Sequence, residues 1–400
     1  MINNEGANFI IARLEKFGYE VYYVGGCVRN ALLSLPIFDY DLTTNALPER
    51  ICEIFSDCEY FTNGIKHGTV SIVLSGEVYE ITTFRKESEY LDYRHPSIVE
   101  FCNDIHEDLA RRDFTINSLA YNKNTGIIDD FGGIYDIQSR VLKCVNDPEK
   151  RFQEDALRIL RGIRLASVYS LSVEKNTARA MLAKRTLISN ISVERILSEF
   201  SKAIIGDNVF TVFNDFKEVI FQIFPEINVE EIDKIFKAIS ISEKDKTIRF
   251  ALLFVFAKEN VESIFKRLKF DSKTAKSLTL LYSCLNFNSY YSREEIKKFL
   301  NRAESIIQLF FKVKILLAKV FDKQDDLSGI ANMQIIYNEI IGNVECFSIK
   351  DLAINGNDLQ NLGYEGIDIK EKLNYLLNEV ICERLENSKE ILLEQLKKDG

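Results

Sequence analysis

The stretch YYVGGCVRN, residues 22–30, followed by FDYDLTT at residues 38–44, decides the fold of this chain. The apolar run before the paired glycines predicts a strand, and the residues from Cys27 onward predict a helix. Glycines between a strand and a helix N-terminus let backbone amides approach a phosphate, the helix dipole favours the anion, and Arg29 adds positive charge. The stretch therefore predicts a phosphate-binding turn.

Two acids, Asp39 and Asp41, follow this turn in a run that predicts a strand over residues 38–44. Alternation along a strand would put both carboxylates on one face, roughly 7 Å apart. Carboxylates held together repel unless a cation lies between them, and Mg²⁺ prefers oxygen ligands. Taken alone, the pair is also expected of an exposed edge strand with two solvated acids. The upstream turn favours a site for a nucleoside triphosphate and its metal, because these need both features at once.

The organisation of the chain changes near residue 143. Before it, short apolar runs alternate with turn signals and helical stretches, which predicts a mixed α/β domain. The segment TVSIVLSGEVYEITTF, residues 69–84, predicts an antiparallel hairpin that turns at Ser75 and Gly76. After about Pro148 the pattern becomes helical throughout, so we expect an α/β head followed by an all-helical remainder.

Composition limits the class of protein. The chain has 400 residues, 46% of them hydrophobic, which is enough for two or more domains. No run of about 18 apolar residues and no signal peptide is present, so we expect no membrane association and a cytoplasmic location. Its eight cysteines form no CxxC pair and its three histidines are scattered. Any metal is therefore expected to be held by oxygen.

The net charge of -9 is unusual for a protein that binds nucleic acid. Residues 151–200 nevertheless hold nine Lys and Arg against five acids, a surplus of 9 - 5 = 4. A solvated helix face is the common explanation of such a charge run.

The segment EDALR, residues 154–158, predicts a helix on which Asp155 and Arg158 are neighbours at i and i+3. A carboxylate accepts a hydrogen bond and a guanidinium donates one. Cytosine and adenine both show a donor amine beside an acceptor ring nitrogen, whereas uracil and guanine show the reverse. The pair can therefore accept C and A and reject U and G, although a surface salt bridge is the usual meaning of this spacing.

Taken together, GGCVRN and FDYDLTT resemble the polymerase-β-like nucleotidyltransferases, and more narrowly the bacterial-type CCA-adding enzymes and poly(A) polymerases. Further motifs similar to those of that family follow in order along the chain. They are FRKESEYLDYRHP (84–96), ARRDFTINSLAY (110–121), DDFGGIYDI (129–137), EDALRILRGIRLA (154–166), SVERILSEFSKAI (192–204) and DLAINGNDLQNLGY (351–364).

The resemblance implies an elongated multidomain protein that extends the 3′ end of tRNA without a template. The implied parts are a catalytic nucleotidyltransferase head (1–142), a helical neck that reads the base (143–210), and a helical body (211–345) and tail (346–400) that bind tRNA. The implied reaction adds C, C and A from CTP and ATP with two Mg²⁺ ions and releases pyrophosphate. No protein partner is implied.

The resemblance also implies roles for individual residues. Asp39 and Asp41 are the expected catalytic and metal-binding residues. The expected nucleotide-binding residues are Gly26, Arg29, Arg112, Asp113, Asp155, Arg158, Arg161 and Arg164. The last two continue the three-residue spacing but drift about 60° around the helix at each step, so Arg164 is assigned through the resemblance alone. Asn117 is left unassigned.

Three features qualify the resemblance. Glu80 is expected beside the metal strand as a candidate third carboxylate. Asn30 stands where the family usually has Asp, which keeps the acceptor oxygen but loses the charge. The loop over residues 85–96 corresponds to one that assists the switch to adding A, so its presence argues against a CC-only enzyme.

The same residues bear on three other functions. An A-adding tRNA enzyme or a poly(A) polymerase would share the motifs. A catalytically silent RNA-binding protein would be expected to have lost acids of the Asp39 and Asp41 pair, and both are present. An added phosphohydrolase activity would need histidines in the helical part, and none follows His106.

Overall fold

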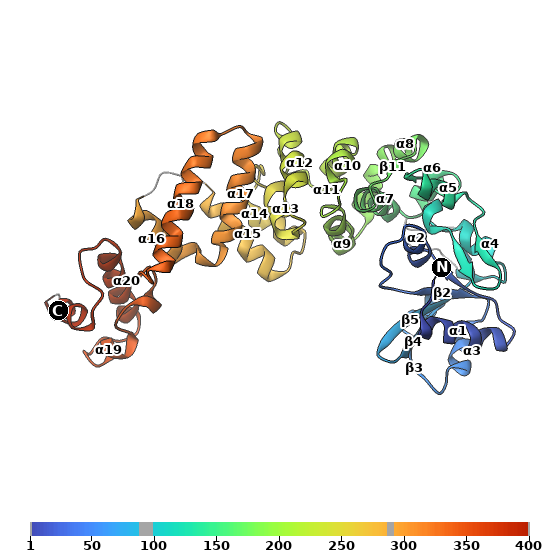
Figure 1. The fold of residues 1–400 in the computed structure, drawn as a ribbon, viewed down its shortest axis with the longest axis horizontal. Coiled ribbons are helices and arrows are strands. Elements are labelled where there is room, and N and C mark those ends of the chain that lie inside the picture. The colour runs from blue at the N-terminus through green and yellow to red at the C-terminus, as the bar shows by residue number, and fades with distance from the viewer. Residues whose placement is uncertain (1, 88–98, 286–291, 399–400) are drawn as a thin grey trace. The chain divides into compact units, whose positions relative to one another are not determined.

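The computed structural model describes residues 2–87, 99–285 and 292–398, and it divides into two compact units, 1–225 and 226–400. Figure 1 shows the strands gathered in the first unit and helices throughout the second. The expected α/β head with a helical remainder is confirmed. In the described part of the chain, no helix is long and apolar enough to span a membrane.

The first unit contains a seven-stranded sheet in the order β3-β4-β5-β2-β1-β8-β9. Its strands are β1 (Val21–Val24), β2 (Asp41–Thr44), β3 (Glu59–Phe61), β4 (Thr69–Leu74), β5 (Glu77–Thr83), β8 (Ala120–Asn122) and β9 (Gly126–Ile128). Only β2 and β5 pair in parallel within this sheet, and the other neighbours are antiparallel. Two short pairs lie outside it: β6 (Arg85–Glu87) with β7 (Val99–Phe101), and β10 (Val141–Leu142) with β11 (Ser172–Val173).

The predicted hairpin is confirmed. Strands β4 and β5 pair from Thr69 to Thr82 and turn at Ser75 and Gly76. These two residues have φ of 51° and 84°, the left-handed pair that a two-residue turn needs to match the twist of its strands. The turn fixes the register between β4 and β5. On its other side β5 pairs in parallel with β2, and there Glu80 lies opposite Asp41.

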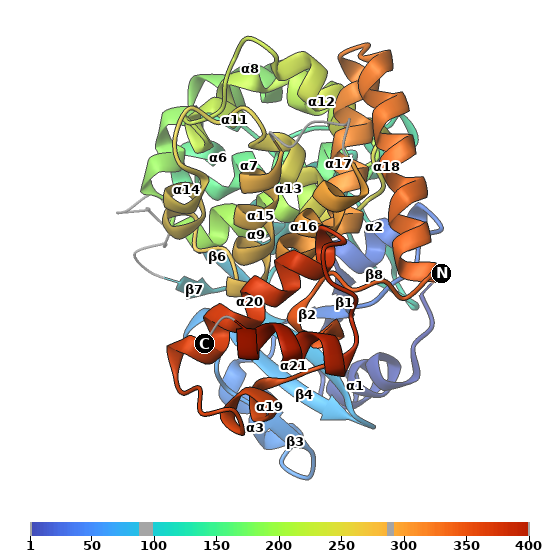
Figure 2. The same cartoon turned by 90° about the vertical axis from the view of Figure 1, so that its left-hand side faces the viewer.

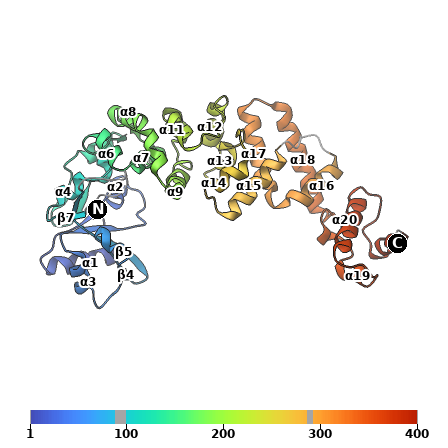
Figure 3. The ribbon, with the colours of Figure 1, turned by 180° about the vertical axis from the view of Figure 1, so that it is seen from behind.

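Short helices cover the sheet. They are α1 (Glu5–Lys16), α2 (Gly26–Leu32), α3 (Pro48–Ile54), α4 (Ile105–Ala110) and α5 (Gly133–Gln138), with 3₁₀ turns η1 (Ile65–His67) and η2 (Thr115–Asn117). Figure 3 shows α1 beside α3, and both contact the sheet. Helix α1 buries Ala7, Ile10, Ile11 and Leu14, the i, i+3, i+4, i+7 stripe of a helix that packs on one face.

The rest of the first unit is mainly helical. It comprises α6 (Pro148–Glu154), α7 (Leu157–Val168), α8 (Lys175–Ala183), η3 (Arg185–Asn190), α9 (Val193–Ala203), α10 (Val209–Asp215) and α11 (Lys217–Ile223). Helix α7 packs mainly on α9. The short strand β11 lies in the part of the chain that the sequence predicts to be wholly helical. It pairs with β10, which lies just before residue 143 in the predicted α/β part.

The described part of the second unit is entirely helical. Its helices are α12 (Ile232–Ile241), α13 (Lys246–Leu253), α14 (Val261–Arg267), α15 (Ser272–Cys284), α16 (Arg293–Ala303), η4 (Glu304–Ile306), α17 (Ile307–Val320), α18 (Gln324–Gly342), η5 (Ile349–Asp351), α19 (Gly356–Gln360), α20 (Ile367–Ile381) and α21 (Lys389–Lys398). Figure 2 shows α17 and α18 running side by side. The segment 346–396 buries an apolar core of its own, built largely on α20 and α21.

Candidate active site

A cavity of about 420 Å³ in the first unit brings together nine of the ten predicted site residues. Its lining comprises Gly25, Gly26, Arg29, Asp41, Arg85, Arg111, Arg112, Asp113, Asn117, Asp155, Arg158, Arg161 and Arg164. Seven arginines face three aspartates there, so the wall is strongly cationic and suits a polyanion. Asp39 is the predicted residue outside this lining. We call this space the arginine-lined cavity.

The predicted phosphate-binding turn forms one end of the cavity. Strand β1 ends at Val24, and Gly25 adopts φ 68° and ψ -123° before α2 begins at Gly26. A Cβ atom at Gly25 would lie 3.1 Å from Nη1 of Arg112, so both the backbone conformation and the close approach favour glycine. Gly25 and Gly26 thus line the cavity at the start of α2, where the sequence predicts the turn.

The strand that carries the paired acids is shorter than predicted, and this is a correction. Strand β2 begins at Asp41, and Asp39 lies in the extended segment before it. The reason is the register, because Leu42 pairs with Tyr23 and the chain of β1 turns away at Gly25. Residues ahead of Asp41 therefore have no partner strand on that side.

Asp41 lies at the cavity wall with further acids beside it. Although its side chain stays open to the cavity, desolvation by the surrounding protein raises its pKa. The charges of Glu80 and Asp39 raise the pKa further, and Arg112 partly opposes them. Glu80 is its register partner on the parallel strand β5, as the resemblance implies. The described residues contain no closed cluster of three or more acid, histidine or cysteine ligands. The excess of negative charge at Asp41 nevertheless fits a cation.

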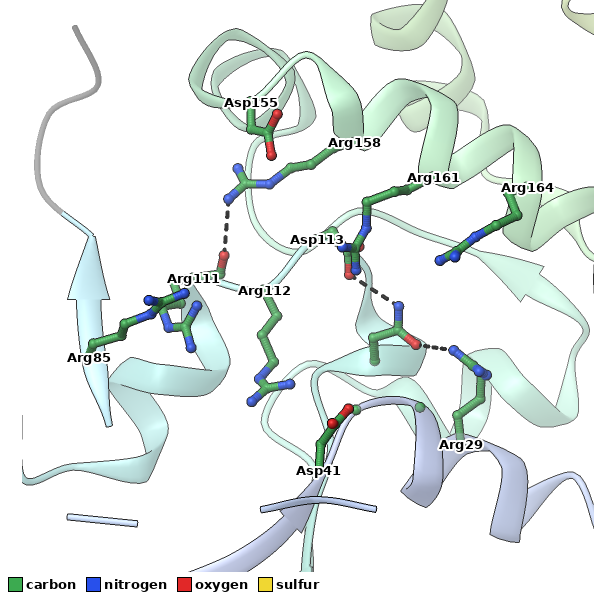
Figure 4. Close-up of a pocket in the computed structure, with 13 residues that line it drawn as sticks. Arg29, Asp41, Arg85, Arg111, Arg112, Asp113, Asp155, Arg158, Arg161 and Arg164 are labelled. Atoms are coloured by element: carbon green, nitrogen blue, oxygen red, sulfur yellow. Dashed lines mark hydrogen bonds and ion pairs between the residues drawn. The ribbon is translucent and has the colours of Figure 1, made fainter. Parts of the chain in front are cut away.

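Asp113 organises the centre of the cavity rather than standing free. Its buried carboxylate accepts hydrogen bonds from Nε of Arg161 at 2.6 Å and from Nδ2 of Asn117 at 3.2 Å. Burial would raise the pKa of Asp113, but Arg161 and the hydrogen bonds outweigh it and lower the pKa to about 2. The contacts run from Arg161 through Asp113 and Asn117 to Arg29. Figure 4 labels Arg161, Asp113 and Arg29 around the cavity.

Arg29 uses most of its donors inside the protein. Its Nη1 donates to Oδ1 of Asn117 at 2.5 Å, its Nη2 to the Tyr169 hydroxyl at 2.6 Å and to Oδ1 of Asn30 at 2.9 Å, and its Nε to the same Asn30 oxygen at 3.2 Å. Burial lowers the pKa of Arg29, and the neighbouring Tyr169 opposes this. The guanidinium is thus fixed in place at the cavity wall by four hydrogen bonds.

Sequence reasoning missed Asp108. This residue lies on α4 and holds two of the cavity arginines in place. This fully buried carboxylate accepts from Nε and Nη2 of Arg111 at 2.9 and 2.7 Å and from Nη2 of Arg112 at 3.0 Å. Burial would raise its pKa, but the two arginines hold the pKa below its usual value. The i, i+3 and i+4 spacing in EDLARR was the available signal.

The base-reading pair needs a correction. Residues 154–158 do not form one helix, because α6 ends at Glu154 and Asp155 has φ -138° and ψ 103°. Oδ1 of Asp155 accepts the N–H of Leu157 at 3.0 Å and so caps the start of α7. A short acidic side chain competes for nearby backbone N–H groups, which is why it favours such a break over a helix interior.

Asp155 and Arg158 still line the cavity together, side by side in Figure 4. Nη1 of Arg158 donates to Oε2 of Glu154 at 2.8 Å and to the Arg151 carbonyl at 2.9 Å, and Nη2 donates to the Arg111 carbonyl at 3.3 Å. The guanidinium is therefore held rigidly at the rim, beside the Asp155 carboxylate.

The remaining predicted residues reach the same space from other elements. Arg164 lies with its Nε 3.1 Å from Oε2 of Glu199 on α9. Arg85, not predicted, comes from β6, and its backbone N–H donates to Asp108 at 3.3 Å. Most of the predicted loop over 85–96 falls in residues 88–98, which lie outside the described residues.

The ion pair of Asp113 gives a pH-dependent prediction. A carboxyl with a pKa of about 2 when folded and about 3.9 when unfolded contributes stability above the unfolded pKa, and this is lost as pH falls through the folded pKa. Asp113→Asn should therefore cost about 2 kcal/mol at pH 6. Calorimetry at pH 6, 4 and 3 should show the difference in melting temperature shrinking below about pH 4. A difference that stays constant with pH would exclude this account.

Family models match nearly the whole chain. Residues 21–143 match "Poly A polymerase head domain", residues 170–231 match "Probable RNA and SrmB- binding site of polymerase A", and residues 225–396 match "tRNA nucleotidyltransferase domain 2 putative". The first match contains the paired acids and the phosphate-binding turn.

Two relatives match over nearly their full length. A CCA-adding enzyme of Lactobacillus helveticus is 34% identical over 385 residues, covering 95% of this chain and 93% of the relative. One of Bacillus cytotoxicus is 33% identical and covers 96% of each chain.

Solved structures match equally far along the chain. The CCA-adding enzyme of Bacillus stearothermophilus in complex with CTP superimposes with a TM-score of 0.77 at 27% identity, covering 98% of this chain and 97% of the other. That of Thermotoga maritima complexed with tRNA gives 0.70 at 19% identity, covering 100% and 97%, and shows the shared fold. With the sequence relatives, these matches show that the chain belongs to the family of CCA-adding enzymes.

Proposed function

We propose that this chain adds C, C and A in turn to the 3′ end of tRNA, taking CTP and ATP as substrates and releasing pyrophosphate. One observation carries the proposal. The arginine-lined cavity holds the Asp41 carboxylate on one side and the Asp155 and Arg158 pair on another, within a space of about 420 Å³. A nucleoside triphosphate needs an acid-held metal, a cationic wall and a base-reading edge in one place. Family membership gives the reaction.

The family uses a divalent metal, and we propose that it is Mg²⁺ held by Asp39 and Asp41, with Glu80 as a third candidate. The raised pKa of Asp41 beside two other acids supports this choice, because the acids repel until a cation joins them. Hard carboxylate oxygens suit Mg²⁺. When bound, the metal activates the RNA 3′-hydroxyl and stabilises the leaving pyrophosphate.

The other residues of the cavity bind and orient the nucleotide. Arg112, Arg161 and Arg164 offer guanidinium donors to phosphate and ribose oxygens, and Arg29 adds positive charge beside the turn at Gly26. Asp113 acts through Arg161, which it holds at 2.6 Å. Asp155 accepts from the exocyclic amine of C or A, and Arg158 donates to the neighbouring ring nitrogen. Uracil and guanine would set donor against donor and acceptor against acceptor.

We assign the domain roles as the sequence predicts, with catalysis in residues 1–142, base reading in 143–210, and tRNA binding in 211–345 and 346–400. A tRNA-contacting role for residues 226–400 is supported by their match to the tRNA nucleotidyltransferase model.

The test uses three tRNA transcripts, which end before CCA, after C and after CC, each incubated with Mg²⁺ and a single nucleotide. We expect C on the first two and A on the third, with no extension beyond CCA. Sequencing gels read the result to one nucleotide. Failure to add C to the first transcript would leave an A-adding enzyme, and a long A tail would indicate a poly(A) polymerase. No incorporation at all would indicate a silent RNA-binding protein.

A further inference from the structure

The segment that carries Asp39 is held to the rest of the protein at few points. Residues 35–40 have no regular secondary structure, and Phe38 is 85% exposed. Two hydrogen bonds tie this segment to Asn30 on α2. The Leu35 N–H donates to the Asn30 carbonyl at 2.8 Å, and Nδ2 of Asn30 donates to the Pro36 carbonyl at 2.9 Å.

The Asn30 side chain works as donor and acceptor at once. Its Oδ1 accepts from Nη2 and Nε of Arg29 at 2.9 and 3.2 Å, and from the Tyr169 hydroxyl at 3.3 Å. A guanidinium can only donate and a carbonyl can only accept, so these partners fix which way the amide points. The amide therefore joins Arg29, at the phosphate-binding turn, to Pro36, three residues before Asp39.

Asparagine, unlike aspartate, can serve both Arg29 and the Pro36 carbonyl. An aspartate would keep the acceptor for Arg29 but would set a carboxylate oxygen against the Pro36 carbonyl, where two acceptors repel. The neutral amide costs Arg29 little, because Tyr169 and Asn117 supply further acceptors at 2.6 and 2.5 Å. The departure from the family's usual Asp thus changes the hold on the loop rather than the hold on Arg29.

We infer that Asn30 is a positioning residue for the metal-binding acids, which fixes the Asp39 segment by its side-chain amide. The inference rests on the metal role proposed above for Asp39. At the other end of the segment, the Tyr40 ring packs edge-on against Tyr23 and β2 begins at Asp41. Because Pro36 is held as well, only the backbone from Ile37 to Tyr40 can change its conformation between the two fixed positions.

The test is Asn30→Asp, measured by binding rather than by activity alone. Free Mn²⁺ read by electron paramagnetic resonance should show about 5- to 10-fold weaker binding than in the parent protein, the size expected for one lost hydrogen bond. CTP binding in the absence of metal, measured by calorimetry, should stay within about twofold, because Arg29 keeps its acceptor. Tyr169→Phe should weaken CTP binding and leave Mn²⁺ binding unchanged, because it removes a partner of Arg29 and leaves the Pro36 bond intact.

Asn374→Asp serves as the matched control. It removes a bond of the same kind, from Nδ2 of Asn374 to the Lys370 carbonyl at 2.8 Å, within the second unit. Neither Mn²⁺ nor CTP binding should change. Asn30→Ala, which removes the amide without adding charge, is the variant to use if the melting temperature of Asn30→Asp falls by more than a few degrees.

Each outcome separates the two proposals. If Asp39→Ala leaves Mn²⁺ binding unchanged, the metal role of Asp39 fails. If Asp39→Ala weakens Mn²⁺ binding while both Asn30 variants bind it as the parent does, the positioning role fails alone. Weaker CTP binding in Asn30→Asp with unchanged Mn²⁺ binding would also overturn it, because Asn30 would then act through Arg29.

Discussion

Asp41→Ala is expected to lower the rate of nucleotide addition by about 10³-fold or more, because several kcal/mol of transition-state stabilisation come from the metal that this acid is proposed to hold. CTP binding without metal should change little or tighten slightly, since the removed carboxylate repels the triphosphate. Single-turnover incorporation of labelled CTP into tRNA, at enzyme in excess, measures the chemical step without product release.

Asp57→Asn is the matched control for this change. Asp57 also belongs to the first unit, but its exposed carboxylate pairs with Arg13 at 2.6 Å away from the cavity lining. Exposed pairs contribute little, so its rate should be that of the parent. Asp41→Asn keeps the shape of the side chain and should be as slow as Asp41→Ala. A rate in either Asp41 variant within tenfold of the parent would refute the metal role.

Changes at Asp155 should alter which nucleotide is added while the chemistry continues. A site that pairs with a substrate group rejects analogues that leave its polar atoms unpaired, so Asp155→Ala should lower the preference for CTP over UTP by about 100-fold. Asp155→Asn should go further toward UTP and GTP, because its amide can donate to their carbonyl oxygens. Competition between nucleotides at equal concentration, read as the ratio of kcat/KM, measures the preference.

Asp155→Asn is also the cleaner variant structurally. Its oxygen can still accept the Leu157 N–H that starts α7, whereas Asp155→Ala loses this cap at a cost of about 1 kcal/mol. Arg158→Ala should relax the preference as well. It also removes the hydrogen bonds to the carbonyls of Arg151 and Arg111, so the melting temperature of this variant must be measured together with its preference. An unchanged C and A preference in all three variants would exclude the base-reading role.

The fold was predictable where a local rule acts by itself. The turn at Ser75 and Gly76 needs two residues of positive φ between alternating runs, and the sequence shows both signals. The strand, glycine turn and helix around Gly25 follow from equally local chemistry. The motifs then named nine of the thirteen residues that line the cavity, although these are spread over more than a hundred positions.

Two features depended on contacts that the sequence does not display. The start of β2 at Asp41 is set by where β1 turns away, and the helix break at Asp155 is set by one carboxylate oxygen that captures a backbone N–H. No role was predicted for Asn117, because this residue acts by joining through hydrogen bonds Asp113 and Arg29, which are 84 residues apart. Such a bridge becomes visible only when the chain is folded.

The helix break at Asp155 has a consequence for how such an enzyme can change over generations. One oxygen of this carboxylate starts α7, and the residue lines the cavity where the base is proposed to sit. A substitution that removes the carboxyl group, such as Asp155→Ala, therefore also loosens the beginning of the helix that carries Arg158, Arg161 and Arg164. Asp155→Asn keeps an acceptor for the Leu157 N–H, so selection for a stable protein opposes the first change and leaves the second to be opposed only by selection for a faithful tRNA end.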